Sequence, residues 1–486
     1  MFLLVTVLSL LSINRFAIGR AYYISLQGND VNPGTKAAPF KTIDKINNIR
    51  LNAGDTVYFQ SGQTFKGTIE IDSVTTGNQS HPIVIRSYGK GIATIDADSA
   101  AAISLYRTQY IAIRHLHLKG AGRKNGNTKS GLLMVGCNHI QVDSMEVSGF
   151  QKPGVLVFTS TEIILRFINA HDNGSAGITI EGDLGKKNSK NILIRYCRAE
   201  NNPGDPTNLT NHSGNGIVVG NCKNVLIDQC TATNNGWDMP RIGNGPVGIW
   251  AYEADSVIIQ HCLSYRNKTS KGGADGGGFD LDGGVTNSII QYCVSYENQG
   301  SGYCIFQYWG ASPWYHNIYR YNISENDGTV SDSQAGLYVW NSSDDEKQFY
   351  DCDVYGNIIY NSKVAAICFS EKSESKGIRF HDNIFVGRDS LIRGIDKIGD
   401  VKYQGNDWWS LKSGFNIDGI KQLKAWVTKT GKEMKDGQVI GLNVFPAFKN
   451  PGKINITSAS QISSFTNYQL PKESGLKDKL KLLQLK

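Results

Sequence analysis

Two aspartates stand two residues apart in GGGFDLDGG, residues 276–284. On a β-strand, side chains at this spacing point to the same face, about 6.5–7 Å apart at the backbone. The oxygens of Asp280 and Asp282 could then lie about 5 Å to 8 Å apart, a range that spans both glycosidase geometries. Proximity also drives two carboxyl pKa values apart and leaves one group protonated. The spacing predicts an acid paired with a base or nucleophile, which together cleave a glycosidic bond.

A third carboxylate and a metal-dependent alternative follow from nearby residues. Glu253 follows Tyr252 directly and is expected one turn from Asp282, which makes it the candidate third carboxylate. In the alternative, Asp275, Asp280 and Asp282 bind Ca²⁺ through oxygen ligands. Lys271 or Arg241 would then abstract the proton α to the carboxyl of a uronic-acid polymer. A structural interpretation also stands, in which glycine N–H groups or a structural cation satisfy the aspartates.

The element that carries the aspartates recurs along the chain as a glycine followed by alternating residues. Positions one and three after the glycine are apolar in the repeats around the aspartates and are expected to point inward, so positions two and four point outward. Outward aromatic rings would then stack beside the aspartates and suit the C–H faces of sugars. They are Trp250, Tyr252, Phe306, Tyr338 and Trp340. We expect a concave patch, open to solvent and walled by loops at 200–215, 234–246 and 266–277; alternatively, the loops cover the rings as a satellite core.

A second repeated strand holds a cysteine at one fixed position. Cys197, Cys230, Cys262 and Cys293 are separated by 33, 32 and 31 residues, and the same slot continues to Leu116, Met145 and Ile168 on one side and to Asn322, Asn357 and Asn383 on the other. Such a column suits the interior ladder of a parallel solenoid, whose turns are roughly 4.8 Å apart. We therefore favour buried free thiols over disulfides or metal ligands, although the count of nine cysteines invites a disulfide framework.

Composition and termini restrict the class of protein. With 486 residues, 53 glycines and only 12 prolines, the chain reads as all-β and repetitive. The apolar start, MFLLVTVLSLLSINRFAIG, predicts a signal peptide over 1–20, with an uncleaved membrane anchor as the alternative. A net charge of +7 is dispersed along the chain, so we expect no nucleic-acid partner.

These features resemble the secreted right-handed parallel β-helix proteins that act on polysaccharides, a group that includes pectate-lyase-like lyases and several glycoside hydrolases. The resemblance implies a β-helix of about ten or more coils. It places an N-terminal cap with the first coils at 21–100, the coils with the cleft at 101–400, and a closing segment at 401–486. The Gly-His-Gly and Asn-Thr-Asp motifs of polygalacturonases are absent, and no clear pectate-lyase signature is present.

Three functions follow as hypotheses for a secreted, extracytoplasmic protein that is expected to be a monomer. The first is a glycoside hydrolase that needs no cofactor and takes a polysaccharide or oligosaccharide. The second is a Ca²⁺-dependent polysaccharide lyase, or a related epimerase. The third is a non-catalytic glycan-binding or adhesion solenoid.

Overall fold

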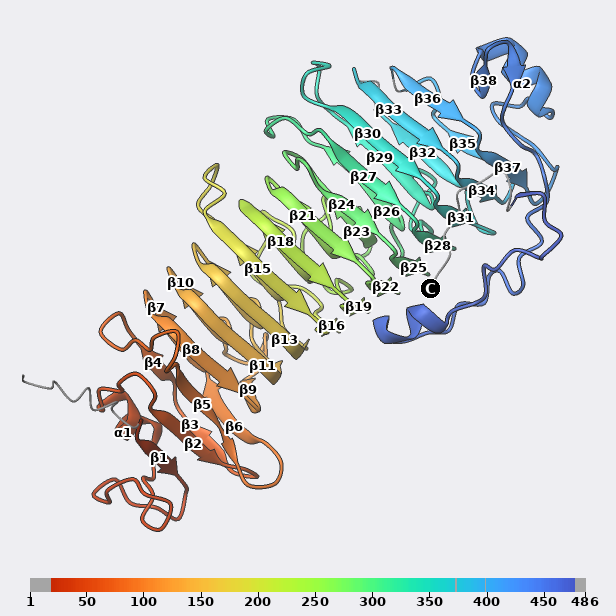
Figure 1. The fold of residues 1–486 in the computed structure, drawn as a ribbon. Helices are drawn as coiled ribbons and strands as arrows, with labels where there is room; N and C mark the ends of the chain where they lie inside the picture. Colours follow the sequence, from red (N-terminus) through yellow and green to blue (C-terminus); the bar gives the residue numbers. More distant parts are fainter. Residues whose placement is uncertain (1–18, 372–373, 398, 477–486) are drawn as a thin grey trace, which may run out of the picture.

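The chain winds into a stack of parallel coils that runs from an N-terminal cap to a C-terminal segment folded back along the stack (Figure 1). This computed structural model describes residues 19–371, 374–397 and 399–476. All but the last two residues of the predicted signal peptide lie outside the described residues. The predicted all-β parallel β-helix is confirmed by two large sheets in which every neighbouring pair of strands is parallel.

One row of strands forms a 12-stranded sheet and carries the glycine-led repeats. Its strands are β4 (Ile69–Ile71), β7 (Ile103–Tyr106), β10 (Leu132–Val135), β12 (Val155–Phe158), β14 (Ala176–Glu181), β17 (Asn215–Gly220), β20 (Val247–Tyr252), β23 (Gly277–Leu281), β26 (Tyr303–Gln307), β29 (Leu337–Asn341), β32 (Ile367–Ser370) and β35 (Ile392–Arg393).

Two further rows make up the 25-stranded sheet, because the long strands β11 and β13 belong to both. The first row is β1 (Ala21–Ile24), β2 (Thr56–Gln60), β5 (Ile83–Tyr88), β8 (Gln109–Arg114), β11 (Asn138–Ser148), β13 (Thr161–His171), β15 (Ser189–Arg195), β18 (Cys222–Asp228), β21 (Asp255–Gln260), β24 (Ile289–Gln291), β27 (Asn317–Arg320), β30 (Tyr350–Tyr355), β33 (Lys376–His381) and β36 (Val401–Gln404). Besides β11 and β13, the second is β3 (Thr64–Lys66), β6 (Ala93–Asp98), β9 (Leu116–Gly120), β16 (Arg198–Glu200), β19 (Thr231–Thr233), β22 (Leu263–Tyr265), β25 (Val294–Tyr296), β28 (Ile323–Glu325), β31 (Ile358–Tyr360), β34 (Ile384–Gly387) and β37 (Asp407–Ser410).

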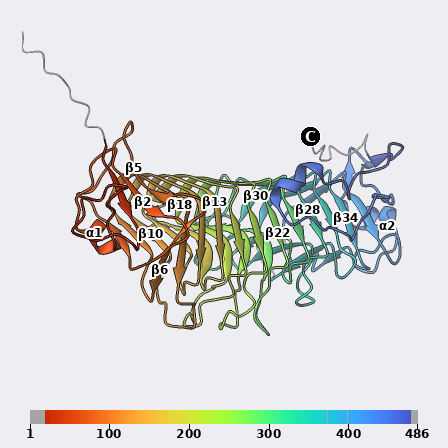
Figure 2. The same ribbon diagram turned by 90° about the horizontal axis from the view of Figure 1, so that it is seen from below.

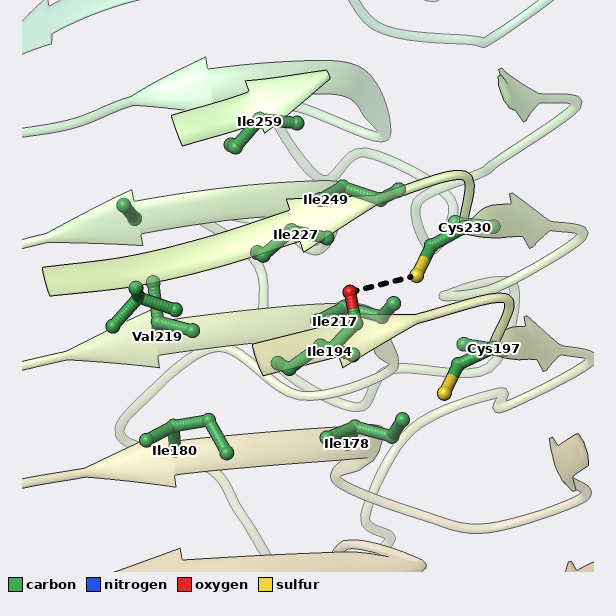
Figure 3. Packing of buried hydrophobic residues seen from close by; sticks show 14 of the residues in the cluster. Ile178, Ile180, Ile194, Cys197, Ile217, Val219, Ile227, Cys230, Ile249 and Ile259 are labelled. Carbon is green, nitrogen blue, oxygen red and sulfur yellow. Dashed lines mark hydrogen bonds between the residues drawn. The ribbon is translucent and has the colours of Figure 1, made fainter. Parts of the chain in front are cut away.

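The interior of the stack is filled by columns of like side chains, as the cysteine spacing predicts. Isoleucines and valines of successive coils lie above one another, and Cys197 and Cys230 occupy the same place in adjacent coils (Figure 3). The backbone N–H of Cys230 donates to Sγ of Cys262 at 3.4 Å, and that of Cys293 donates to the Asn322 side chain at 3.0 Å. All nine cysteines are buried free thiols.

Both ends of the stack are closed. At the N-terminus α1 (Ile43–Asn47) begins at Thr42, whose hydroxyl accepts from the N–H of Lys45, and it buries Ile43 and Ile46. At the other end α2 (Leu423–Thr430) buries Trp426 and ends at Gly431, which adopts a left-handed conformation with φ 67°. Between α2 and the returning segment lies a small hairpin of β38 (Met434–Lys435) and β39 (Gln438–Val439).

The C-terminal segment then returns over the second row of strands. It carries the 3₁₀ helix η1 (Ala459–Ser464), and its apolar residues pack on Leu263, Tyr265 and Tyr296. The start of η1 is held to the second row by a hydrogen bond from the backbone N–H of Ala459 to the hydroxyl of Thr231 at 3.0 Å. No helix in the described ranges is both long and apolar enough to cross a membrane.

Long loops gather along one edge of the middle coils (Figure 2). Residues 201–214, 234–246 and 266–276 precede β17, β20 and β23, and they correspond to the three loops that the sequence predicts as walls.

Candidate active site

The predicted register of the 12-stranded sheet is confirmed. Along one outward column Trp250 pairs with Asp280, Asp280 with Cys304, and Cys304 with Tyr338. Phe279 and Leu281, which alternate with the aspartates, lie in the interior core. Asp282 comes directly after the last residue of β23, so the two carboxyls sit at the end of one strand on its outer side.

The expectation of an open patch is wrong for three of its residues. Asp280 is 2% exposed, Trp250 4% and Phe306 5%. In β17, β20, β23 and β26 nearly every residue is buried, whereas strands such as β10 and β12 alternate between buried and half-buried residues. The outer face is therefore covered at these four coils, and Tyr252, Asp282, Tyr338 and Trp340 remain half-buried.

One side-chain oxygen of Asp280, Oδ1, is buried without a hydrogen-bond partner. Burial, together with the nearby carboxyls of Asp282 and Asp275, holds the pKa of Asp280 well above its ordinary value. An ionised carboxylate without a partner is expensive to bury, which favours the protonated form of this group.

Asp282 and Asp275 are weaker acids than usual for the same main reason. Burial raises the pKa of Asp282 to about 7, against a backbone hydrogen bond from Gly283 to its Oδ1 at 2.7 Å. Burial likewise raises the pKa of Asp275 to about 6, although the N–H of Gly245 donates to it at 2.7 Å and Arg241 lies near enough to lower it. The structure thus brings these three carboxyls into one electrostatic cluster.

Glu253 is near this cluster but has another partner. It is 8% exposed, and its Oε1 accepts a hydrogen bond from the N–H of Ser312 at 2.8 Å and one from the hydroxyl of Tyr308 at 3.4 Å. Its charge acts on the pKa of Asp282. The carboxylate predicted as a third catalytic group therefore holds the loop that follows β26.

Trp250 and Tyr252 belong to a covered cluster. Trp250 packs on Ala176, Val218 and Val247, and its indole N–H donates to Asn215 at 3.0 Å. The ring of Tyr252 lies over Gly220, where a Cβ would come within 2.3 Å of it, and its hydroxyl donates to Glu181 two coils away. These two rings therefore form the satellite core under the loops that the sequence allows as the alternative to an open patch.

Phe306, Tyr338 and Trp340 form a second group on the other side of the aspartates. The ring of Phe306 meets Tyr338 edge-on at 5.1 Å and Trp340 at 5.7 Å. Tyr338 and Trp340 keep partly exposed surface, so these two rings remain available to a ligand.

The residues assigned to the calcium alternative do not form a ready site. Among the described residues, no group of three or more acidic, histidine or cysteine side chains lies close enough to hold a metal ion. Lys271 is exposed and makes no ion pair with the carboxyls, whereas Arg241 lies within electrostatic range of Asp275. The Ca²⁺ alternative therefore has no group of three acidic side-chain ligands among the described residues.

Two further titratable side chains lie next to the site. His212, on the loop before β17, meets Trp250 edge-on at 4.7 Å, and burial lowers its pKa to about 4. Glu181 is in the outward column beside Gly220, but periodicity alone does not reveal that the Tyr252 side chain crosses that glycine to reach it.

A separate groove of about 760 Å³ lies on the 25-stranded sheet, away from the carboxyls. Its floor is apolar, with Ile164, Leu193 and Ile258 among its residues. It contains no pair of neighbouring carboxyls and is not the candidate active site.

Comparison with known proteins places this fold in a class. The description "Pel9A-like, right handed beta helix region" matches residues 22–330, so the chain belongs to this family of right-handed β-helix proteins. Among solved structures it is similar to the GH136 lacto-N-biosidase from Eubacterium ramulus, with 16% identity, a TM-score of 0.54, and coverage of 74% of this chain and 68% of that one. It is also similar to the A-module of the mannuronan C-5 epimerase AlgE6 from Azotobacter vinelandii, with 14% identity, a TM-score of 0.51, and coverage of 73% and 90%. At these identities the likeness is one of fold. No curated protein sequence matches the chain.

Proposed function

We propose that this protein is a secreted glycoside hydrolase that cleaves a polysaccharide or oligosaccharide with Asp280 and Asp282. The observation that carries the proposal is the buried and unpaired carboxyl oxygen of Asp280, whose pKa is held well above its ordinary value, two residues from a second carboxyl whose pKa is raised to about 7. Two carboxyls with different proton affinities are the chemical requirement of glycoside hydrolysis.

The two carboxyls, Asp280 and Asp282, would have different roles in the reaction. Asp280 is buried in the free protein, so the segments that cover it would have to move aside for the substrate. It would then give its proton to the glycosidic oxygen as the bond from that oxygen to the anomeric carbon breaks. Asp282, which has the larger exposed surface, would act as the carboxylate. It would either take a proton from the attacking water or attack the anomeric carbon itself.

Substituting each aspartate by asparagine tests the assignment. D280N and D282N should fold and lose activity by about three orders of magnitude or more, because an amide cannot donate or accept the catalytic proton. Activity is measured as product release from a panel of neutral and acidic glycans. D327N, which changes a buried aspartate outside the site, is the matched control. Full activity in both D280N and D282N would overturn the proposal.

A Ca²⁺-assisted lyase or epimerase on a uronic-acid polymer is the second candidate. It is favoured by the cluster of Asp275, Asp280 and Asp282, whose mutual repulsion a divalent cation would relieve. In this case backbone carbonyls or water would have to complete the ligand set, because no three acidic side chains of the described residues lie close enough to hold a metal ion. A lyase would give unsaturated products that absorb in the ultraviolet and disappear with a chelator, whereas hydrolysis gives new reducing ends without that absorbance.

A further inference from the structure

Trp309 is the one tryptophan in the described ranges whose side chain is mostly in solvent. It is 78% exposed, and it follows β26 at the tip of the loop 308–313. Burying a side chain of this size stabilises a protein by about 2–3 kcal/mol, and Trp309 does not contribute this stabilisation. Its ring has no aromatic or cationic partner among the described residues. Exposure of a single apolar residue is ordinary, so the argument depends on how the loop is held.

The loop that presents Trp309 is fixed at both ends. The side-chain amide of Gln307 donates to the carbonyl of Ser312 at 3.0 Å, and its oxygen accepts from the N–H of Gly284 at 3.2 Å. The N–H of Ser312 donates to the buried carboxylate of Glu253. A charge-assisted bond in a buried place is a strong restraint, so the loop presents its tip in a defined position.

The same loop packs against the turn that follows Asp282. A Cβ on Gly283 would come within 2.4 Å of the Tyr308 ring and 2.7 Å of Ala311, so only a glycine allows the loop this close. Trp309 lies between those two contact residues in the chain. The backbone of Trp309 therefore lies in a loop that contacts the turn directly after Asp282.

We infer that Trp309 is a carbohydrate-binding platform, on which a pyranose ring of the substrate stacks next to the sugar held at Asp282. This inference rests on the proposed function, because the ligand is the same glycan. A flat, partly apolar ring on a loop that is fixed next to a carboxyl pair suits the C–H face of a sugar. Glu253 is then a positioning residue, which acts through the loop and not on the substrate.

Affinity electrophoresis tests the platform separately from catalysis. The D280N protein is run through native gels that contain polygalacturonate, alginate or a neutral β-glucan, with and without the additional substitution W309A. We expect W309A to weaken retardation about tenfold in the gel that retards the parent, the loss of one aromatic stacking contact. W309F should retain most of the binding. L184A is the matched control, because Leu184 is an 87% exposed apolar residue on the loop that follows β14, four strands before β26 in the same sheet.

The outcomes separate this inference from the proposed function. Unchanged retardation in W309A, or an equal loss in L184A, overturns the platform even if the wild type cleaves the glycan. Binding through Trp309 without cleavage by the wild type overturns the hydrolase and leaves the platform. If none of the three polysaccharides retards D280N, the platform is overturned for these polymers.

The positioning role of Glu253 has its own readout. E253A removes the acceptor for Ser312 and should raise KM, while E253Q keeps an oxygen acceptor and should restore it. A fall in kcat in E253Q, with KM unchanged, would show that Glu253 acts on the reacting atoms and would overturn the positioning role.

Discussion

Asp327 and Asp280 are both buried aspartates of the β-helix, but only one has its hydrogen bonds made. Asp327 ends a ladder of asparagines that runs through Asn235, Asn267 and Asn298 in successive coils. Its Oδ1 accepts from the backbone and side-chain N–H groups of Asn298 at 2.8 and 2.9 Å, and its Oδ2 accepts from Ser324 at 2.7 Å. Asp280 lies on the outer side of the sheet with Oδ1 unpaired.

The difference shows what a raised carboxyl pKa means in each place. Burial raises the pKa of Asp327 to about 7 and that of Asp280 well above its ordinary value, so the shift alone does not distinguish the two residues. Structural networks perturb pKa values as active sites do. What separates Asp280 from Asp327 is the missing partner of its Oδ1, together with its place beside a second outer carboxyl, Asp282.

The largest expected effect on stability is at Asp327. D327A should lower the free energy of unfolding by about 2–4 kcal/mol, because it leaves the donors of Asn298 and Ser324 unsatisfied. D327N should stay within about 1 kcal/mol of the wild type, because an asparagine there could still accept from Asn298. Its side-chain amide could donate to Ser324, as the amide of Asn298 donates to Ser295. Urea denaturation measures both. An equal loss in D327A and D327N would mean that the carboxylate charge, and not the ladder geometry, matters.

A smaller effect is expected from the titration of the outer aspartates. A carboxyl whose pKa is higher in the folded protein binds more protons there than in the unfolded chain, so stability falls as pH rises through that window. For Asp282 the window runs from about pH 4, the ordinary value, to about pH 7. D282N lacks this loss and should be more stable than the wild type at pH 7 by about 1–3 kcal/mol, after allowance for solvent screening, with little difference at pH 4. Denaturation curves at pH 4, 5.5 and 7 would contradict this if the two proteins kept a constant difference.

Much of the fold could be predicted because the sequence repeats with nearly the same period in successive coils. The 31- to 33-residue spacing of Cys197, Cys230, Cys262 and Cys293 fixes the coil, and alternation along a strand then fixes which side chains face outward. The pairing of Trp250 with Asp280 and of Phe306 with Trp340 follows from that alignment alone.

The loops could not be placed in the same way, because they have no period. Whether Trp250 is open or covered depends on the segments 201–214 and 234–246, whose course is set by contacts such as that of His212 with Trp250. Glu253 falls where a third catalytic carboxylate is expected, but the N–H it binds belongs to Ser312, 59 residues away. Trp309 lies outside the repeated strand, so strand alternation does not single it out.

The smallest effects are expected from substitutions of two buried cysteines, Cys230 inside the stack and Cys304 on the outer side of the sheet. Cys230 lies inside the stack, and C230A should cost about 1 kcal/mol, roughly the value of one buried methylene group, in a space that stays apolar and dry. Cys304 pairs with Asp280 on the outer side, so C304A opens space beside the unpaired Oδ1, where a water molecule could donate a hydrogen bond. That bond favours the ionised form and should lower the pKa of Asp280 toward its ordinary value. The total loss of stability as pH rises through the titration of Asp280 should then be smaller in C304A than in the wild type, whereas C230A should keep the wild-type loss. An identical pH dependence in all three proteins would contradict the expected effect of C304A on Asp280, and the contrast between the interior ladder and the outer carboxyl would fail.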